Sequence, residues 1–528
     1  MSKMPISRRG FLGSAALAGA AGFANSSTRA NDGAIATTGV TLFAFDDVSI
    51  PHRRNLRLNM HQPQKHPANP VLPHGKPGEP DEYRAQFYGS IVREGGRFRM
   101  WYIAGDNDGM QTVANKTAYF GWRAAYAESE DGIHWNKPYL GLVEYRGNRR
   151  NNLLKIDPPD VTGLTLVLLH EPEDPDPKRR YKMMHQIRWA EAPAFGWTTS
   201  VPLFSRDGYE WKLETKGAPQ NYAISTNDMP LPPEHTEQSG LYKWQGMYYL
   251  TGQQLSPWAY LADGSECGRI MTSFRSSDFV NWKQSKTLNY VRHGYVSMPQ
   301  ALGKESHSPA SVWNRGNVLL GLHGLWNGAP NLADRTMPMG LLISNDGLHF
   351  REPVPDSVFV PHGEDGAWDA RGLLSGQEFE HVGDLTYIWY GTWNLSEPRS
   401  ENTPGAVGLL TMRRDGFGSL SPMSAGAPAE LVTCTFDAGL ADRLVVNADG
   451  LGNDARLRIE LVDELERPVA GFSGDRAALV ADSGVLTPVR WPQSGPVPAG
   501  TGPVRLQVTF EGSRSDRIQL YAVYAGAT

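Results

Sequence analysis

Short runs in which apolar and polar residues alternate recur along most of the chain. Alternation with a period of two, carried here by many aromatic and branched side chains, is typical of β-strands. The clearest runs are RFRMWYIAG from Arg97, RRYKMMHQI from Arg179, GMYYLTGQ from Gly246, NVLLGLHGLW from Asn317 and LTYIWYGTW from Leu385. Each follows another candidate strand, namely QFYGSIV from Gln86, GLTLVLLH from Gly163, SGLYKW from Ser239, PASVWN from Pro309 and GLLSGQEF from Gly372. The chain is therefore predicted to consist mainly of short antiparallel strands.

A turn motif recurs after these strands and reveals an internal repeat. It reads SEDGIHW from Ser129, SRDGYEW from Ser205, SSDFVNW from Ser276 and SNDGLHF from Ser344, and a weaker fifth copy, RRDGF, places Asp415 in register. Successive aspartates are 76, 71, 68 and 69 residues apart. Because Ser, Asp and Gly are turn residues, the motif indicates a turn rather than a reacting group. Five units of about four strands each predict a five-bladed β-propeller.

The pattern changes after about residue 420. The segments LVTCTF, RLVVNAD, RLRIELVD, VRLQVTFEG and IQLYAVYAG alternate apolar and polar residues and are separated by turns rich in Gly, Asn and Pro. This is typical of antiparallel strands with one face in water. The predicted fold is therefore all-β, with the propeller over residues 31–420 and a C-terminal β-sandwich domain over residues 421–528.

The first thirty residues read as an export signal. Arg8 and Arg9 precede an apolar run from Phe11 to Ala24 that is rich in Gly and Ala. The run is shorter than the roughly 20 residues of a membrane span, and the paired arginines favour a twin-arginine signal peptide over residues 1–30. The mature chain is then expected without a membrane span, in the bacterial periplasm or secreted.

Charge and cysteine content narrow the class of partner. The 528 residues include 51 basic and 56 acidic residues, interspersed, with a formal net charge of −5. This balance argues against a nucleic-acid partner. Two cysteines, Cys267 and Cys434, do not make a disulfide framework, and whether they pair is left open. The oligomeric state is not indicated by the sequence.

Candidate functional residues gather where the first strand of each unit begins. Ligands of propellers collect at that end of the channel, and carboxylates mixed with His, Arg and Trp suit glycoside chemistry, in which one carboxyl protonates the leaving oxygen and another activates water or attacks the sugar. The candidate catalytic carboxylates are Asp81, Glu237, Glu305 and Asp369. The candidate substrate-binding residues are Arg84, His235, His307, Trp368, Arg371 and His66.

The chain resembles a family of known enzymes. The five-unit register, the SSDFVNW form of the turn, the segment HQPQKHPANPVL and the trailing sandwich are similar to the propeller enzymes of glycoside hydrolase families 43 and 32. DEYRAQFYGSIVREGGRFRMWY, WNRGNVLLGLHGLW, GDLTYIWYGTW and VVNADG with LRIELVD are similar to an uncharacterised family 32-like group of exported bacterial proteins. The family 32 signature WMNDPNG is absent.

The resemblance implies roles for the carboxylates. Asp81 would be the base or nucleophile, Glu237 the acid, and Asp369 or Glu305 would tune or orient them. The function expected is an exported glycoside hydrolase that acts on an oligosaccharide or polysaccharide. Two alternatives stay open: a phosphorylase that uses phosphate in place of water, and a non-catalytic carbohydrate-binding protein. No cofactor is expected, although turn aspartates or the channel could hold a structural calcium ion.

Overall fold

The structure is a computed structural model that describes residues 39–106, 112–113, 116–117, 122–157, 165–188, 198–214, 236–255, 269–285, 289–292, 303–392, 404–492, 495–498 and 500–526. These residues form strands joined by turns and short 3-10 helices such as η1 (Pro177–Arg179) and η5 (Ala438–Asp442), without an α-helix. The all-β prediction is confirmed. No helix in the described ranges is long and apolar enough to cross a bilayer. The predicted signal peptide and Cys267 lie outside the described residues, and Cys434 is half-buried.

Antiparallel strand groups follow one another along the chain between residues 64 and 413. The first holds β5 (Arg84–Glu94), β6 (Arg97–Gly105) and β9 (Trp122–Ser129), and the second holds β11 (Leu166–His170), β12 (Tyr181–Arg188), β13 (Thr198–Ser205) and β14 (Glu210–Leu213), with β10 (Lys155–Asp157) parallel to β14. The third holds β15 (Thr236–Trp244), β16 (Met247–Leu255), β17 (Arg269–Ser276) and β18 (Lys283–Gln284), and the fourth holds β19 (Gly303–Asn314), β20 (Leu319–Gly328) and β21 (Met339–Ser344). The fifth holds β22 (Leu373–Val382), β23 (Leu385–Thr392), β24 (Val407–Arg413) and the N-terminal β4 (Gln64–Lys65). Between β6 and β9 of the first group, β7 (Thr112–Val113) and β8 (Lys116–Thr117) pair as a small separate hairpin.

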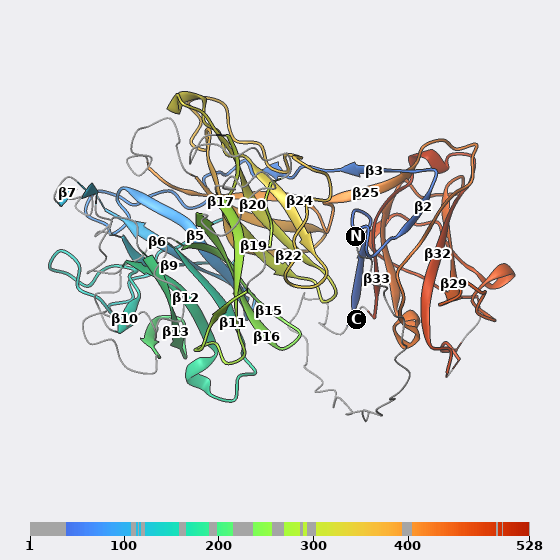
Figure 1. Cartoon of the computed structure of the whole chain (residues 1–528), viewed down its shortest axis with the longest axis horizontal. Coiled ribbons are helices and arrows are strands. Elements are labelled where there is room, and N and C mark those ends of the chain that lie inside the picture. Colours follow the sequence, from blue (N-terminus) through green and yellow to red (C-terminus); the bar gives the residue numbers. More distant parts are fainter. Residues whose placement is uncertain are drawn as a thin grey trace, which may run out of the picture.

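These five groups are arranged in a ring, in the left part of Figure 1. The first strands lie beside one another in the order β5, β11, β15, β19 and β22, and β22 lies beside β5. A buried hydrophobic cluster fills each space between neighbouring groups. Trp101 shares a cluster with Met183 of the second group, and Phe98 shares one with Trp389 of the fifth. Burial of apolar surface between the groups therefore holds the ring together.

The repeated motif forms turns, as predicted. In the first copy the Ser129 hydroxyl accepts a hydrogen bond from the N–H of Gly132 at 2.9 Å, and Asp131 Oδ1 accepts one from the N–H of His134 at 2.8 Å. The next three copies repeat the serine and aspartate bonds. A Cβ on Gly132 would lie 2.8 Å from the ring of Trp389, which belongs to the fifth group, the neighbour of the first in the ring. The turn thus also fixes the spacing between two groups.

The fifth copy uses its aspartate differently. Asp415 is fully buried and pairs with the Arg315 guanidinium of the fourth group, with Nη2 at 3.1 Å from Oδ2. It also bonds to His381 Nε2 at 3.1 Å and to the hydroxyl of Tyr524 at 2.7 Å. Because Tyr524 lies near the C-terminus, this carboxylate joins the fourth and fifth groups to the last strand of the chain.

Twelve strands form two further sheets in the right part of Figure 1. One sheet holds β1 (Val40–Phe43), β3 (Leu56–Met60), β25 (Gly418–Pro422), β28 (Leu444–Asp449), β31 (Gly484–Pro488) and β33 (Gln519–Ala525). The other holds β2 (His52–Arg54), β26 (Ala429–Val432), β27 (Phe436–Asp437), β29 (Arg456–Asp463), β30 (Ala478–Val480) and β32 (Pro503–Glu511). Both sheets contribute to one hydrophobic cluster.

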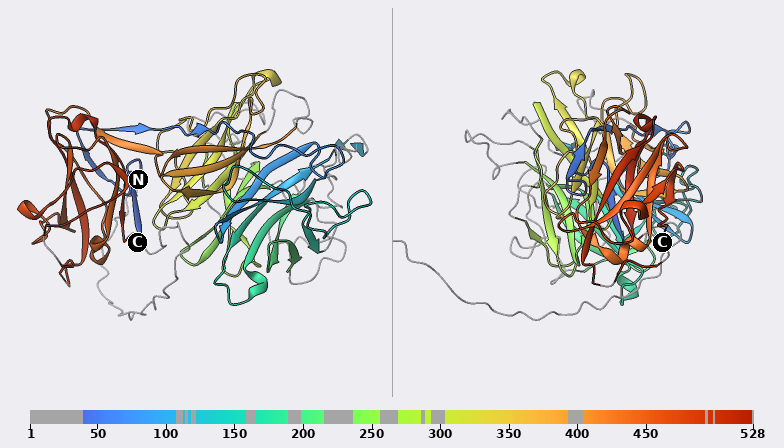
Figure 2. Two further views of the ribbon diagram at one scale, coloured as in Figure 1. Left: turned by 180° about the vertical axis from the view of Figure 1, so that it is seen from behind. Right: turned by 90° about the vertical axis from the view of Figure 1, so that its right-hand side faces the viewer.

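The N-terminal strands belong to these sheets. β1 pairs with β33, β2 with β26 and β3 with β25, although residues 40–60 fall within the range predicted for the propeller. β3 and β25 run side by side between the two parts of the molecule, and the view from behind shows the same arrangement (Figures 1 and 2). The division at residue 420 stays a prediction, and strand pairing adds residues 40–60 to the C-terminal unit.

A partly buried glutamate on β22 makes stability depend on pH. Burial raises the pKa of Glu380 to about 7, and Arg93 only partly opposes this. Since the unfolded value is about 4.3, the folded protein holds this proton more tightly, so stability is full below about pH 4.3 and declines as the pH rises toward 7. We expect Glu380→Gln to raise the free energy of unfolding by about 2 kcal/mol above pH 7 and to leave it unchanged near pH 4. Urea denaturation at both pH values tests this; an equal effect at both would contradict it.

Candidate active site

A buried ion pair lies where the fourth strand group begins. Glu305, near the start of β19, is 0% exposed, and its Oε2 accepts a hydrogen bond from Arg269 Nη1 at 2.9 Å. Arg269 is the first residue of β17 in the neighbouring group. A buried carboxylate is costly unless it is paired, so the two side chains depend on each other. Nε of Arg269 is also buried, and no hydrogen-bond partner for it occurs in the described part of the chain.

Two rings lie beside this pair. The Arg269 guanidinium lies 4.8 Å from the ring centre of Trp326, and the His307 ring is nearly parallel to that of Trp326, with centroids 5.6 Å apart. Trp326 also shares a small buried cluster with Tyr88 of β5 and Leu374 of β22. Side chains from the first, third, fourth and fifth groups thus converge here, toward the centre of the ring. We call Glu305, Arg269, His307 and Trp326 the Glu305 cluster.

Half of this cluster is predicted from the sequence. Glu305 and His307 were predicted because they stand at the start of a first strand. Arg269 begins a third strand and Trp326 lies near the end of a second strand. In an antiparallel group these positions lie at the same end as the start of the first strand, so the strand register contained a signal for them.

Two predicted residues can be followed only in part. His235 lies outside the described residues, as does the side chain of Glu237. The backbone of Glu237 pairs with Gln253 near the start of β15, and β15 lies beside β19. The strand that carries the predicted acid is therefore the neighbour of the strand that carries Glu305.

Arg84, predicted to bind substrate, begins β5 and is 3% exposed. Its Nη1 donates to Gln86 Oε1 at 2.8 Å, and its guanidinium lies 5.6 Å from the ring centre of Trp122. Next to this strand, the buried carboxylate of Asp106 pairs with Arg123 at 2.9 Å. Asp106 and Arg123 were not predicted, although they flank the second and third strands of this group at the same end.

Asp81 and Asp369 have other bonding partners than the Glu305 cluster. Asp81 is 0% exposed, and its Oδ2 accepts a hydrogen bond from the Tyr102 hydroxyl at 2.7 Å and pairs with Lys137. Asp369 is 3% exposed and accepts a hydrogen bond from Tyr390 at 2.9 Å. In the described residues neither carboxylate forms a hydrogen bond or ion pair with the cluster. Of the three predicted carboxylates whose side chains are described, Glu305 thus has different bonding partners from Asp81 and Asp369.

The other predicted binding residues lie in loops. Trp368 is half-buried, with its ring centre 5.6 Å from that of Tyr390. Arg371 has a positive φ of 67° and pairs with the exposed Asp365 at 2.8 Å. His66 follows β4, is half-buried, and accepts a hydrogen bond at Nδ1 from the N–H of Ala68 at 3.2 Å. None of these three side chains is bonded to the Glu305 cluster in the contacts described.

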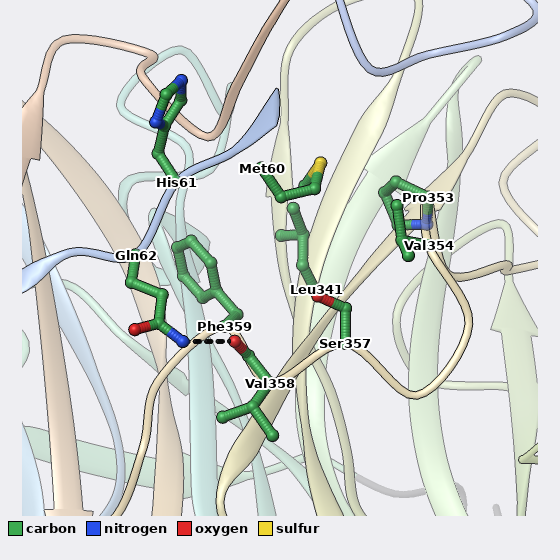
Figure 3. A pocket seen from close by; sticks show the side chains of 9 residues that line it. All are labelled: Met60, His61, Gln62, Leu341, Pro353, Val354, Ser357, Val358 and Phe359. Atoms are coloured by element: carbon green, nitrogen blue, oxygen red, sulfur yellow. Dashed lines mark hydrogen bonds between the residues drawn. The ribbon is translucent and has the colours of Figure 1, made fainter. Parts of the chain in front are cut away.

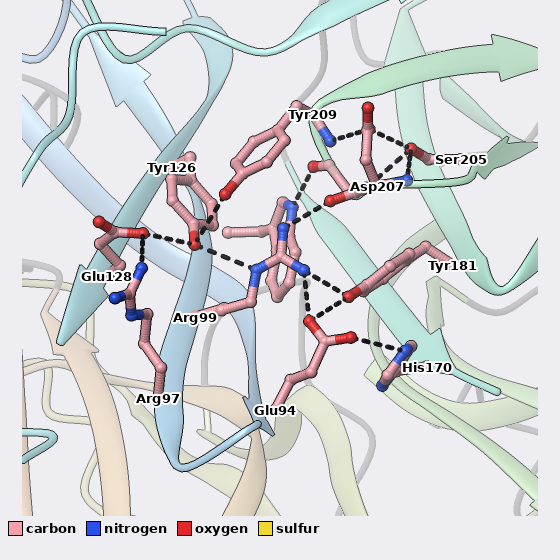
Figure 4. A network of polar contacts seen from close by, with 12 residues as sticks. Glu94, Arg97, Arg99, Tyr126, Glu128, His170, Tyr181, Ser205, Asp207 and Tyr209 are labelled. Atoms are coloured by element: carbon pink, nitrogen blue, oxygen red, sulfur yellow. Dashed lines mark hydrogen bonds and ion pairs between the residues drawn. The ribbon is translucent and has the colours of Figure 1, made fainter. Parts of the chain in front are cut away.

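A second polar network lies toward the opposite ends of these strands (Figure 4). Arg99, on β6, donates from Nε to the Tyr126 hydroxyl at 3.1 Å, pairs with Glu94 at 2.8 Å and donates to the Tyr181 hydroxyl. Glu94 in turn lies 3.5 Å from His170. Because Tyr181 and His170 belong to the second group, this network joins the first two groups. The Arg99 N–H donors are engaged in hydrogen bonds within it.

A pocket lies beside the strand that connects the two parts of the molecule (Figure 3). It is lined by Met60, His61, Gln62, Leu341, Pro353, Val354, Ser357, Val358 and Phe359. Gln62 Nε2 donates to the carbonyl of Val358 at 2.8 Å, and His61 Nε2 lies 2.9 Å from the Ser419 hydroxyl. Burial lowers the pKa of His61. The polar side chains His61 and Gln62 are bonded to other parts of the chain, which makes this pocket a poor candidate for the active site.

No group of three or more His, Cys, Asp or Glu side chains in the described ranges is arranged to hold a metal ion. The turn aspartates, one predicted place for calcium, direct a carboxylate oxygen to backbone N–H groups.

No protein-family model matches the chain, and no curated protein matches it in sequence. Among solved structures the chain aligns with a glycosyl hydrolase from Bacteroides ovatus at 14% identity, over 67% of this chain and 94% of that chain, with a TM-score of 0.41. It aligns with a structure described under the GH130 family of mannoside phosphorylases, which contains glycoside hydrolases that target β-1,2 mannosidic linkages in Candida mannan, at 15% identity over 67% and 94% with a TM-score of 0.41. An N-acetylgalactosamine deacetylase from F. plautii aligns at 12% identity over 68% and 96% with a TM-score of 0.42. These TM-scores are too low for the alignments to indicate a function.

Proposed function

We propose that the chain is a carbohydrate-active enzyme, a glycoside hydrolase that is exported through its N-terminal signal and works in the channel of a five-bladed β-propeller formed by the five strand groups. The C-terminal sheets would form a β-sandwich accessory domain. The observation that supports this most is the buried Glu305 and Arg269 pair with His307 and Trp326, where four strand groups converge.

The cluster suits one half of glycoside chemistry. A carboxylate paired with a guanidinium is the anionic member of an acid and base pair, and would activate or orient water. Glu237, on the neighbouring strand, would supply the proton to the leaving oxygen. The Arg269 guanidinium, whose side chain is 13% exposed, would donate to a sugar hydroxyl.

A phosphorylase is the second candidate, and the same arginine favours it. Guanidinium groups bind phosphate oxygens well, and the Arg269 guanidinium lies against Trp326, which stacks on His307. Phosphate would then take the place of water as the nucleophile, with the sugar phosphate as product. The two reactions differ only in this nucleophile, so one assay separates them.

The test is sugar release by the protein without residues 1–30 from aryl glycosides and plant and algal oligosaccharides, with and without phosphate. We expect wild type to release sugar without phosphate and Glu237→Gln to lose about 10²–10⁴-fold in rate. Glu210→Gln is the matched control: Glu210, on β14, forms an exposed ion pair with Lys155 on β10, and this variant should retain the full rate. Phosphate-dependent release would establish the phosphorylase instead. Binding without turnover in every variant would establish a carbohydrate-binding protein.

A further inference from the structure

Two loops that precede first strands share one sequence pattern. PHGKPGEPDEYR from Pro73 leads into β5, and PHGEDGAWDARG from Pro361 leads into β22. In both, an aspartate stands six residues after the glycine of Pro-His-Gly, which pairs Gly75 with Asp81 and Gly363 with Asp369. The glycine N–H donates to the carbonyl of that aspartate in both loops, at 2.7 and 2.9 Å. The two loops therefore close on themselves in the same way.

The aspartate side chains also have matching partners. In each loop Oδ2 accepts a hydrogen bond from a tyrosine on the second strand of the group and pairs with a lysine. The members are Asp81, Tyr102 at 2.7 Å and Lys137 at 2.5 Å in the first loop, and Asp369, Tyr390 at 2.9 Å and Lys65 at 2.7 Å in the second. The lysines come from distant parts of the chain, so the match reflects the position in the strand group.

The other carboxylate oxygen faces the loop glycine. A Cβ on Gly75 would lie 2.3 Å from Asp81 Oδ1, and one on Gly363 would lie 2.2 Å from Asp369 Oδ1. Such separations are far inside van der Waals contact, so only glycine leaves room for the aspartate at either place. Each carboxylate is thus enclosed between its own loop, a tyrosine and a lysine.

We propose that these two sets are positioning devices, which we call loop locks, and that Asp81 and Asp369 do not react with substrate. A reacting acid and base need different environments so that one holds a proton while the other does not. Asp81 and Asp369 instead share one pattern: each is almost fully buried, is bonded to a tyrosine and a lysine, and lies against its loop glycine. The locks instead hold the loops that place Arg84 at the start of β5 and Trp368 and Arg371 before β22. The part of this inference that concerns substrate rests on the proposed function.

The first test is a stability cycle on the first lock. Lys137→Met leaves the buried Asp81 carboxylate without its ion pair, and Asp81→Asn leaves the half-buried Lys137 ammonium without its anionic partner. We expect each change to lower the Tm by about 5 °C. The double variant leaves neither charge unpaired, so its loss should be smaller than the sum of the two. Tyr102→Phe is a milder variant that keeps the charges but removes the hydrogen bond to Asp81 and the one from Asn152 Nδ2. Lys155→Met, from an exposed pair, is the control and should not change the Tm.

The second test uses the sugar-releasing assay on the same variants. A positioning role predicts that Lys137→Met and Asp81→Asn each raise KM by about tenfold with little change in kcat, and that the double variant has a KM closer to that of wild type. A purely structural role would lower the Tm and leave KM unchanged. If the double variant stays as inactive as Asp81→Asn while folded, Asp81 reacts with substrate and the inference is wrong. If no substrate is turned over, the proposed function fails, whereas the Tm cycle still decides whether the lock exists.

Discussion

Asp415→Ala is expected to lower the free energy of unfolding by about 3–5 kcal/mol, because it leaves the buried Arg315 guanidinium without its anionic partner. Arg315 has 5% and Asp415 0% of its side chain exposed, so water cannot replace the lost contact. The same change removes the bonds from His381 and Tyr524. Because Tyr524 belongs to β33, the loss should weaken the attachment of the C-terminal sheets as well as the contact between the fourth and fifth strand groups.

Urea denaturation of Asp415→Ala beside Asp131→Ala measures this effect. Asp131 belongs to the first copy of the same motif, but its carboxylate is partly exposed and caps only its own turn, so its removal should cost about 1 kcal/mol. Equal losses in the two variants would contradict the special role of the fifth copy. Arg315→Met combined with Asp415→Leu should recover much of the stability, since neither buried charge remains.

Acid should act on the same pair. Burial alone would raise the pKa of Asp415, but Arg315 and His381 hold that pKa well below its usual range. Its contribution to stability is therefore full above the unfolded pKa of about 3.9 and is lost as the pH falls below that value. This direction is opposite to that of Glu380, so the two groups favour a stability maximum between them.

Glu305→Gln is expected to lower kcat by about 10²–10⁴-fold if this carboxylate activates the nucleophile. The variant should still fold, with a lower Tm, because Arg269 loses its anionic partner. The amide keeps the size of the side chain and one acceptor for Arg269 but removes the charge that the proposed reaction needs. The rate is measured on the sugar that wild type releases, and circular dichroism and the Tm show whether the variant is folded.

The neighbouring arginine allows a second, matched change. Arg269→Lys keeps the charge beside Glu305 but removes the planar fork and its Nε–H, so KM should rise by about tenfold with a smaller effect on kcat. Glu210→Gln serves again as the control. A folded Glu305→Gln variant with wild-type kcat would remove the cluster from the proposed active site.

Local patterns of the sequence determined the elements of this fold. Alternation with a period of two predicted the strands, and the Ser and Asp of the repeated motif predicted the turns, because both depend on residues close together in the chain. The same register pointed to Glu305 and His307, since it locates the starts of first strands. It did not reveal that Asp81 and Asp369 would share one bonding pattern, which depends on Lys137 and Lys65.

The tertiary structure decided the contacts between distant residues. The pairing of β1, β2 and β3 with strands near the C-terminus, the meeting of Arg269 with Glu305, and the bond from Tyr524 to Asp415 each join parts of the chain that no local pattern relates. A buried charge needs its counter-charge in space rather than in sequence, so the choice among the candidate carboxylates became physical only after folding. Local sequence patterns were enough to locate the strands and turns. Which side chains share a site depended on packing, because burial and charge pairing act between surfaces that only the folded chain brings together.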